Sequence, residues 1–304
     1  MALAVGIDIG GTKTAIALVK ENGDIVESAV IPTEADIAPD LMIDKMIAVL
    51  NDILRKAGVT AKDVAGIGIG APGVIDLAKG EFTFAPNLPW RDVPIVARFS
   101  EAFPVPVRLG NDANVAALAE KWLGAARECD HFIYITISTG IGGGIYLNGK
   151  LYTGSRGNAG EIGHIVVEHN GRTCGCGQKG CFEAVASGTA IAKIGSELAG
   201  RPLSTKEVFD LYFAGDPVIK PFVEDVFNKI GAGCTSLINL FEPEMIVLGG
   251  GVTNVGTPLF DAVKRYVSEH AISPAGRATA IVPSQLSQNT GVIGAAALIL
   301  KNGE

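Results

Sequence analysis

The chain has 304 residues, of which 48% are hydrophobic and 19% are charged, so it is long enough for two domains and can bury a large core. Its net charge is -7 and no Lys/Arg cluster is visible, which argues against nucleic acid as the main partner. Since no apolar run reaches the roughly 18 residues of a membrane span and no signal peptide is visible, we expect a protein of the reducing cytoplasm.

The first half of the chain predicts an α/β domain that begins with a hairpin. Gly10-Gly11-Thr12 separates two short apolar runs, and Asn22-Gly23 signals a second turn. A run with helical spacing of its apolar residues ends at Gly58. We expect strands at 4–9, 14–19, 64–69 and 105–109, a proline-containing loop at 84–90, and helices at 40–57 and 113–123.

The opening pattern recurs in the second half. A strand runs into a glycine turn at residues 138–144, and a later strand ends at Gly249-Gly250-Gly251. We interpret the repeat as an internal duplication that gives two α/β halves with a cleft between them. We expect strands at 132–137, 145–147 and 245–248, helices between 181 and 240, and a last helix at 290–300 that packs back on the first half.

These elements suggest two domains. Residues 1–116 together with 288–304 are expected to form the smaller one, and residues 117–287 the larger one. The junction is expected within the helix at 113–123.

The glycine turns are candidate phosphate loops. Glycine lets backbone N–H groups approach phosphate oxygens closely, and Thr12 adds a hydroxyl donor. Asp8 is a carboxylate near a strand end, suited to hold Mg²⁺ through water. Thr139 and Gly140 could cradle the other side of a polyphosphate, and Gly249 to Gly251 could line a nucleotide base or ribose. The alternative is that the glycines only make sharp turns.

Asp112 is a candidate general base. It follows a predicted strand and precedes a helix whose N-terminus favours an ionised carboxylate. A kinase that phosphorylates a hydroxyl needs such a carboxylate to accept the proton. The alternative is a plain helix cap, which is a common use of Asn and Asp.

Several polar residues could line a pocket for a polyhydroxyl ligand, which needs convergent acceptors and amides. As alternatives, Asn87 could be a turn residue beside Pro86, and Glu183 a charge in the first turn of a helix. The candidates are Asn87, Asn111, Asp112, Glu161, His164 and Glu183.

A histidine and three cysteines have the spacing of a metal site. His164 is followed by Cys174, Cys176 and Cys181 in a glycine-rich segment. Four N/S ligands suit structural tetrahedral zinc, which would fix a loop carrying Glu161, His164 and Glu183. Free thiols, a disulfide, or His169 as the ligand in place of His164 are the alternatives. Cys129 and Cys234 lie in apolar surroundings that are typical of core residues.

Together these motifs resemble the ROK family of bacterial sugar kinases and repressors. The matching segments are 8–13, 110–112, 138–144, 160–164 and 174–183, which extend over much of the chain. The resemblance implies a two-domain actin/hexokinase-like (ribonuclease H-like) fold and a homodimer or dimer of dimers. It implies zinc at His164, Cys174, Cys176 and Cys181, and ATP contacts from Asp8, Gly10, Gly11, Thr12, Lys13, Thr139, Gly140, Gly249, Gly250 and Gly251.

The implied reaction is ATP- and Mg²⁺-dependent phosphorylation of a hexose at its 6-hydroxyl, with Asp112 as base. We expect glucose as the substrate. A kinase for fructose, mannose, allose, N-acetylglucosamine or N-acetylmannosamine is the nearest alternative, and a non-catalytic sugar-sensing regulator is an alternative of another class. The chain starts at its first strand, so we do not expect the DNA-binding segment of the family's repressors.

Overall fold

The computed structural model describes residues 2–85, 88–286 and 289–301, which form two compact units. Unit 1 comprises Met1–Glu128, Gly144–Gly160 and Gln285–Glu304, and unit 2 comprises Cys129–Gly143 and Glu161–Ser284. The chain therefore passes between the units more than once. The domain limits at residues 116/117 and 287/288 remain a prediction.

Unit 1 contains a mixed five-stranded sheet of order β3-β2-β1-β4-β8. β1 and β2 form the predicted antiparallel hairpin, β3 pairs antiparallel with β2, and β4 and β8 run parallel to β1. The strands are β1 (Leu3–Ile9), β2 (Lys13–Lys20), β3 (Ile25–Pro32), β4 (Ile67–Ala71) and β8 (Val107–Asn111).

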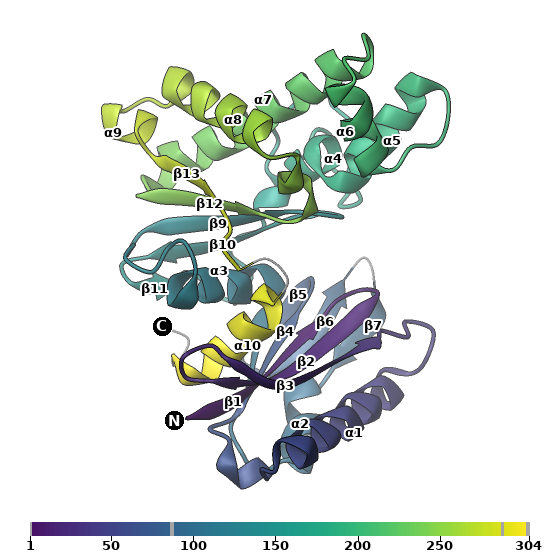
Figure 1. Ribbon diagram of the computed structural model, residues 1–304, viewed down its shortest axis with the longest axis vertical. Coiled ribbons are helices and arrows are strands. Elements are labelled where there is room, and N and C mark those ends of the chain that lie inside the picture. Colours follow the sequence, from purple (N-terminus) through teal and green to yellow (C-terminus); the bar gives the residue numbers. More distant parts are fainter. Residues whose placement is uncertain (1, 86–87, 287–288, 302–304) are drawn as a thin grey trace. The chain divides into compact units, whose positions relative to one another are not determined.

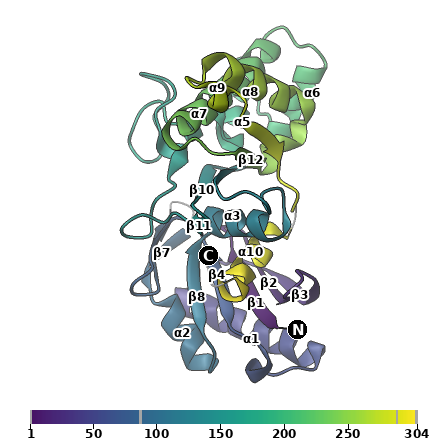
Figure 2. The ribbon, with the colours of Figure 1, turned by 90° about the vertical axis from the view of Figure 1, so that its left-hand side faces the viewer.

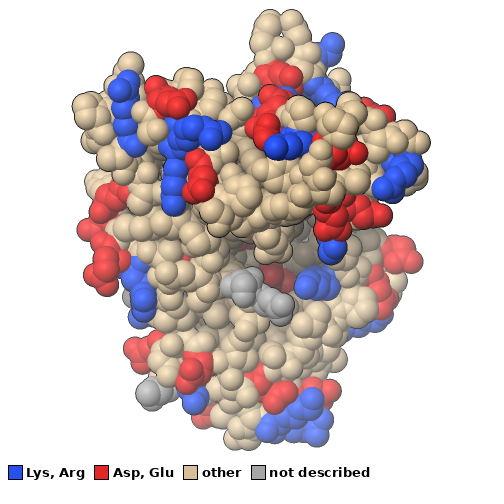
Figure 3. Space-filling view, turned by 45° about the horizontal axis from the view of Figure 1, so that its top comes forward, with Lys and Arg blue, Asp and Glu red and all other residues tan. Residues whose placement is uncertain are grey.

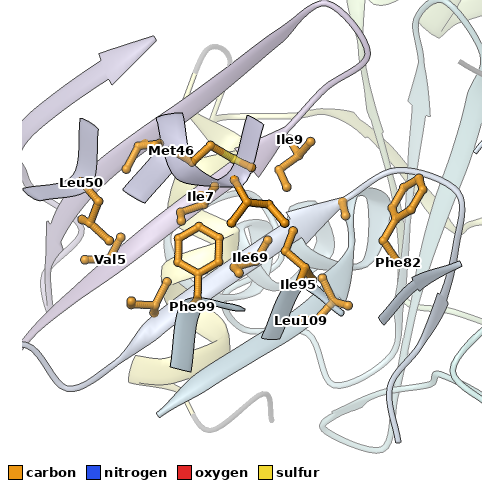
Figure 4. Close-up of a cluster of buried hydrophobic side chains, with 14 of the residues drawn as sticks. Val5, Ile7, Ile9, Met46, Leu50, Ile69, Phe82, Ile95, Phe99 and Leu109 are labelled. Atoms are coloured by element: carbon orange, nitrogen blue, oxygen red, sulfur yellow. The ribbon is translucent and has the colours of Figure 1, made fainter. Parts of the chain in front are cut away.

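One face of this sheet carries the main hydrophobic core of unit 1. Alternate residues of β1 point to it, and they pack with Met46 and Leu50 of α1 (Pro39–Ala57) and with Phe99 of α2 (Ile95–Ala102) (Figure 4). α1 ends at Gly58, whose φ of 70° is the left-handed conformation expected of a glycine helix stop. The helix predicted at 40–57 is therefore confirmed.

The opposite face of the sheet is covered by α10 (Thr290–Leu300), which lies beside β1 in Figure 2. Val292 and Ala296 of α10 pack against Ala4, on the face opposite to Val5 and Ile7. This confirms that the last helix packs on the first half. Two glycines allow the close approach, because a Cβ at Gly6 or Gly68 would lie 1.9 Å or 1.8 Å from a carbonyl oxygen of α10.

The loop predicted at 84–90 is wrong for the described residues. Residues 84–85 belong to β6 and residues 88–90 to β7 of a three-stranded antiparallel sheet of order β5-β6-β7. The prolines suggested a loop, but Pro89 lies on the edge strand, where a missing N–H is tolerated. Leu88 and Trp90 are buried on the inner face. The strands are β5 (Val74–Asp76), β6 (Glu81–Ala85) and β7 (Leu88–Val93).

The second mixed sheet has the order β11-β10-β9-β12-β13, which repeats the arrangement of the first sheet. β11 pairs antiparallel with β10, as β3 does with β2, and β12 runs parallel to β9, as β4 does to β1. This equivalence supports an internal duplication. The strands are β9 (Phe132–Ile137), β10 (Ile141–Leu147), β11 (Lys150–Leu151), β12 (Met245–Gly249) and β13 (Ala280–Pro283).

The return strand of the second hairpin is longer than predicted. Gly142, Gly143 and Gly144 belong to β10 instead of the turn, which is confined to residues 138–140. Gly144 is needed for packing, because a Cβ there would lie 2.6 Å from the Ala117 side chain of α3 (Asp112–Leu123). A glycine-rich segment can therefore be strand where a helix lies close to it.

Apart from its strands, unit 2 is mostly helical (Figure 1). The helical region predicted at 181–240 contains four helices, and the last of them begins at Ile219. Among the described residues, no helix combines the length and apolar character needed to cross a membrane. The helices are α4 (Phe182–Ala186), α5 (Gly188–Ala199), α6 (Thr205–Phe213), α7 (Ile219–Phe241), α8 (Thr257–His270) and α9 (Pro274–Arg277), with 3₁₀ turns at Ile162–His164 and Gly251–Val255. Unit 1 has a 3₁₀ turn at Ala61–Asp63.

Candidate active site and metal centre

In unit 1, the candidate base and the candidate Mg²⁺ carboxylate lie at the same edge of the sheet. Asp8 of β1 is in register with Gly70 of β4, which is in register with Gly110 of β8, just before Asn111 and Asp112. Neighbouring strands are about 4.8 Å apart, so the backbones of β1 and β8 are separated by roughly 10 Å. This arrangement brings together residues more than 100 positions apart in the chain.

Asn111 is the N-cap residue of helix α3, and the Asp112 Oδ1 atom also accepts a hydrogen bond from the Ala113 N–H at 2.8 Å. The Asn111 Oδ1 atom accepts hydrogen bonds from the backbone N–H groups of Ala113 and Asn114 at 3.0 Å and 3.3 Å. Its Nδ2 atom donates to the Gly73 carbonyl at 3.1 Å. Asp112 is the first residue of the helix, where the helix N-terminus favours a carboxylate in its ionised form. Asn87, the other amide of the predicted sugar pocket, lies outside the described residues.

Asp8 is packed against the start of α10. A Cβ at Gly291 would lie 2.0 Å from the Asp8 Oδ2 atom, so only glycine leaves room for this carboxylate. Burial raises the pKa of Asp8, and the positive charge of Lys13 opposes part of that rise. No local sequence pattern linked Gly291 with the first glycine turn.

The first glycine turn joins β1 to β2. The Gly10 N–H donates to the Lys13 carbonyl at 2.9 Å, and Gly11 is partly buried while Thr12 and Lys13 are exposed. The exposed backbone of this turn and the Thr12 hydroxyl can donate hydrogen bonds to a phosphate group, as the motif predicts.

In unit 2, the second and third glycine turns lie against each other. A Cβ at Gly250 would come 2.4 Å from the carbonyl oxygen of Ile137, the last residue before the second turn. Thr139 and Gly251 are exposed, Gly140 is partly buried and Gly249 is buried. These two turns can therefore contribute to one binding surface, whereas the first turn belongs to unit 1.

The four candidate metal ligands come together in unit 2. Their ligand atoms all lie within 4.8 Å of one another. The Cys174 Sγ and His164 Nδ1 atoms are 3.6 Å apart, as are the sulfurs of Cys176 and Cys181. Tetrahedral zinc, with bonds of about 2.3 Å to sulfur and about 2.1 Å to nitrogen, requires edges of about 3.6 to 3.8 Å. Donor chemistry and spacing thus fit a tetrahedral metal ion.

The alternative ligand His169 is exposed and is not part of this group. All five cysteines are free thiols, and Cys129 and Cys234 are buried as predicted. Burial raises the pKa of the Cys181 thiol to about 12, so an incoming metal ion must displace its proton.

Glu161 is the N-cap residue of the short 3₁₀ turn that ends with His164. The His164 Nε2 atom, which is not the nitrogen that faces Cys174, is 3.9 Å from Glu161 Oε2. Burial raises the pKa of Glu161; His164 opposes this effect, and the negative charge of Glu183 adds to it. The three candidate sugar contacts in unit 2 therefore lie close enough to influence one another electrostatically.

Ion pairs that the motifs did not reveal hold the metal-binding segment to the helices. Lys229 of α7 pairs with Glu168 at 3.3 Å. The Arg172 Nη1 atom donates to Glu197 of α5 at 3.1 Å. The partners are 25 or more positions apart, so no periodic charge pattern could identify them.

The family comparison covers nearly the whole chain. A model of the ROK family matches residues 4–302. The chain is 35% identical over 310 residues to a glucokinase of Halalkalibacterium halodurans, with 97% of this chain and 94% of that protein covered. It is 31% identical over 297 residues to a xylose repressor of Bacillus subtilis, with 98% of this chain and 77% of the repressor covered.

Solved structures share the architecture. A ROK hexokinase from Thermus thermophilus has a TM-score of 0.87 and 35% identity over 99% of both chains. A ROK family glucokinase from Streptomyces griseus, in complex with glucose and AMPPNP, has a TM-score of 0.81 and 33% identity over 99% of this chain and 100% of that one. The fold is therefore the two-domain actin/hexokinase-like fold, and the chain belongs to the ROK family, in which it is similar to sugar kinases.

Proposed function

We propose that this protein is an ATP-dependent hexokinase that transfers the γ-phosphate of ATP to the 6-hydroxyl of glucose. The observation that carries the proposal is the position of Asp112 at the first residue of α3, at the same sheet edge as Asp8. Similarity to a glucokinase solved with glucose and AMPPNP supports glucose as acceptor and ATP as donor.

In the proposed reaction, Asp112 accepts the proton of the 6-hydroxyl as its oxygen attacks the γ-phosphorus. The bond from that phosphorus to the β-phosphate oxygen breaks, and ADP leaves. Asp8 would hold Mg²⁺ through water, and the glycine turns and Lys13 would hold the phosphates, with Gly249 to Gly251 at the nucleoside. Mg²⁺ would supply positive charge that offsets the charge of the phosphates.

The proposed contacts to the hexose are amide, carboxylate and imidazole groups. Asn87, Asn111 and Asp112 would contribute from the first part of the chain, and Glu161, His164 and Glu183 from the metal-binding part. Zinc would be bound by His164, Cys174, Cys176 and Cys181 and would have a structural role, since four protein ligands leave no open position. The zinc-bound loop would then form one wall of the sugar pocket.

The partners we propose are small molecules, and the working compartment is the cytoplasm, where ATP and reduced thiols are available. On the face shown in Figure 3, Lys and Arg side chains are interspersed with Asp and Glu side chains. That pattern does not resemble the continuous basic surface of a nucleic-acid-binding protein. A homodimer or a dimer of dimers is the assembly that we propose.

A coupled ADP-release assay across a hexose panel tests this function. The panel contains glucose, fructose, mannose, allose, N-acetylglucosamine and N-acetylmannosamine, each with ATP and Mg²⁺. We expect the highest kcat/KM with glucose. A higher value for another sugar would change the substrate, and glucose binding without turnover of any sugar would favour a sugar-sensing regulator, as the similarity to a xylose repressor allows.

A further inference from the structure

One carboxylate of the proposed sugar site is bonded to the second glycine turn. Glu183 lies in α4, two residues after the metal-ligand cysteine Cys181. Its Oε2 atom accepts a hydrogen bond from the Ile141 backbone N–H at 2.9 Å. Ile141 is the first residue of β10 and directly follows Gly140. Both groups belong to unit 2, so this contact lies within one compact body.

The same carboxylate lies directly on the backbone of the turn. A Cβ at Gly140 would be 2.4 Å from Glu183 Oε2, so a larger residue at this position would displace the carboxylate. Thr139 and Gly140 are the residues proposed to contact phosphate. The position of Glu183 therefore bears directly on the shape of a phosphate turn.

The segment after Glu183 holds the other side of this turn. The Gly188 N–H donates to the Ser138 carbonyl at 2.7 Å, and the Thr189 N–H donates to the Thr139 carbonyl at 3.4 Å. These bonds are backbone to backbone and remain when the Glu183 side chain is changed. The side-chain bond to Ile141 can thus be tested separately from them.

We propose that Glu183 is a positioning residue for the phosphate turn as well as a sugar contact. A carboxylate has about four acceptor sites, so Oε1 can accept from a sugar hydroxyl while Oε2 holds Ile141. A sugar that orders Glu183 then also orders the turn, and binding of hexose and nucleotide becomes mutually favourable. This inference rests on the proposed kinase function and adds a direct link between its two substrates.

The test is the affinity of the sugar-free protein for Mg²⁺·AMPPNP. In Glu183→Ala the bond to Ile141 is lost, and we expect nucleotide affinity to fall by about tenfold, the size typical of a hydrogen bond to a charged group. Glu161→Ala is the matched control, because Glu161 is also a proposed sugar contact but no bond to the turn was found for it among the described residues. It should weaken sugar binding and leave the sugar-free nucleotide affinity unchanged.

A second pair of variants separates the effect of side-chain length at position 183 from the effect of its charge. Glu183→Gln keeps an acceptor oxygen at the same reach, so nucleotide affinity should stay close to that of the wild type. Glu183→Asp keeps the charge but shortens the side chain, so affinity should fall as it does in Glu183→Ala. Zinc content and thermal melting of every variant show whether the fold is intact.

Three results would overturn the inference: wild-type nucleotide affinity in Glu183→Ala, equal losses in Glu183→Ala and Glu161→Ala, or affinity retained in Glu183→Asp and lost in Glu183→Gln. If Glu183→Ala does not fold, the Asp and Gln variants decide. If the wild type phosphorylates a hexose and the variants give one of these results, only the role of Glu183 is refuted. A wild type that binds no nucleotide and phosphorylates no hexose refutes the kinase function and this role with it.

Discussion

At the scale of single residues, the carboxylate of Asp112 is positioned by its own helix and that of Asp8 by packing against a distant part of the chain. Asp112 is placed by its own helix, which Asn111 caps. Asp8 is placed by distant packing, since α10 brings Gly291 against its side chain. Both residues were identified from local motifs, but only the structure shows that they share one edge of the sheet.

The role of Asp112 is testable by an isosteric change. Asp112→Asn removes the proton acceptor and keeps the volume, so kcat should fall by about 10² to 10⁴-fold while glucose binding is largely retained. Asp52→Asn on the exposed side of α1 is the control and should keep wild-type kcat. Steady-state kinetics and calorimetric glucose titration measure both values. Near-normal turnover in Asp112→Asn would rule out the general-base role.

The partly buried carboxylate of Asp8 should lower stability in the absence of substrates. Burial raises its pKa above the ordinary value of 3.8, so above that pH the unfolded chain releases the proton more readily than the folded one. The stability contribution of the protonated group is complete below that pH and is lost as pH rises. Asp8→Asn should therefore melt at a higher temperature than the wild type at pH 7.5, with a smaller difference near pH 4.5.

The same Asp8→Asn change should reduce kinase activity, because an amide is a weaker partner for Mg²⁺ than a carboxylate. Lys13→Met is a useful comparison, since Lys13 opposes the pKa rise of Asp8 and its loss should not raise stability. A Tm difference that does not change between pH 4.5 and 7.5 would contradict the explanation by burial.

At the scale of elements, the sequence predicted seven of the strands but missed β5, β6, β7 and β13, and the limits of several predicted strands differ from the observed ones. β9 and α10 have the predicted bounds, whereas β4 and β8 begin two or three residues later than expected. Val64 is the C-cap residue of the preceding 3₁₀ turn, and the Val105 N–H donates a hydrogen bond to the Phe103 carbonyl. Apolar residues at strand starts are therefore not always part of the ladder.

The metal-binding segment should be stabilised by its ion. In Cys176→Ser one of four ligands is weakened, so zinc content should fall below one per chain, Tm should drop by several degrees, and glucose KM should rise by about tenfold or more. Cys129→Ala, a change outside the metal group, should retain full zinc content. Metal analysis, melting and kinetics measure these effects. A zinc-free variant with normal glucose KM would show that the ion does not support the sugar pocket.

At the scale of the whole molecule, two sheets of the same strand order account for the repeated motif pattern. The duplication was visible as two glycine-turn hairpins, each followed later by a strand that ends in glycine. The small sheet of β5 to β7 interrupts the first half, and the helices between α4 and α7 enlarge the second. The last helix returns to unit 1, so the two chain ends belong to the same unit.

Close packing of α10 on the first sheet should depend on glycine. In Gly68→Ala, the new methyl group would meet the Ala295 carbonyl at 1.8 Å, so helix and strand must separate, with an expected loss of about 2 to 3 kcal/mol in the free energy of unfolding. Gly251→Ala is the control, because a Cβ there has no neighbour within 4 Å. Urea unfolding of both variants measures the difference. Equal stability of the two variants would show that α10 adjusts without cost.

The sequence by itself determined the features that depend on neighbours in the chain: the glycine turns, the stop of α1 at Gly58, the metal-ligand spacing and the family. Tertiary structure decided which distant groups meet, such as Asp8 with Gly291 and Glu183 with Ile141. These contacts join residues 42 or more positions apart, and they depend on strand register and on helix packing across the sheet. Neither leaves a periodic signal in the sequence, because a single contact requires only one suitable residue on each side.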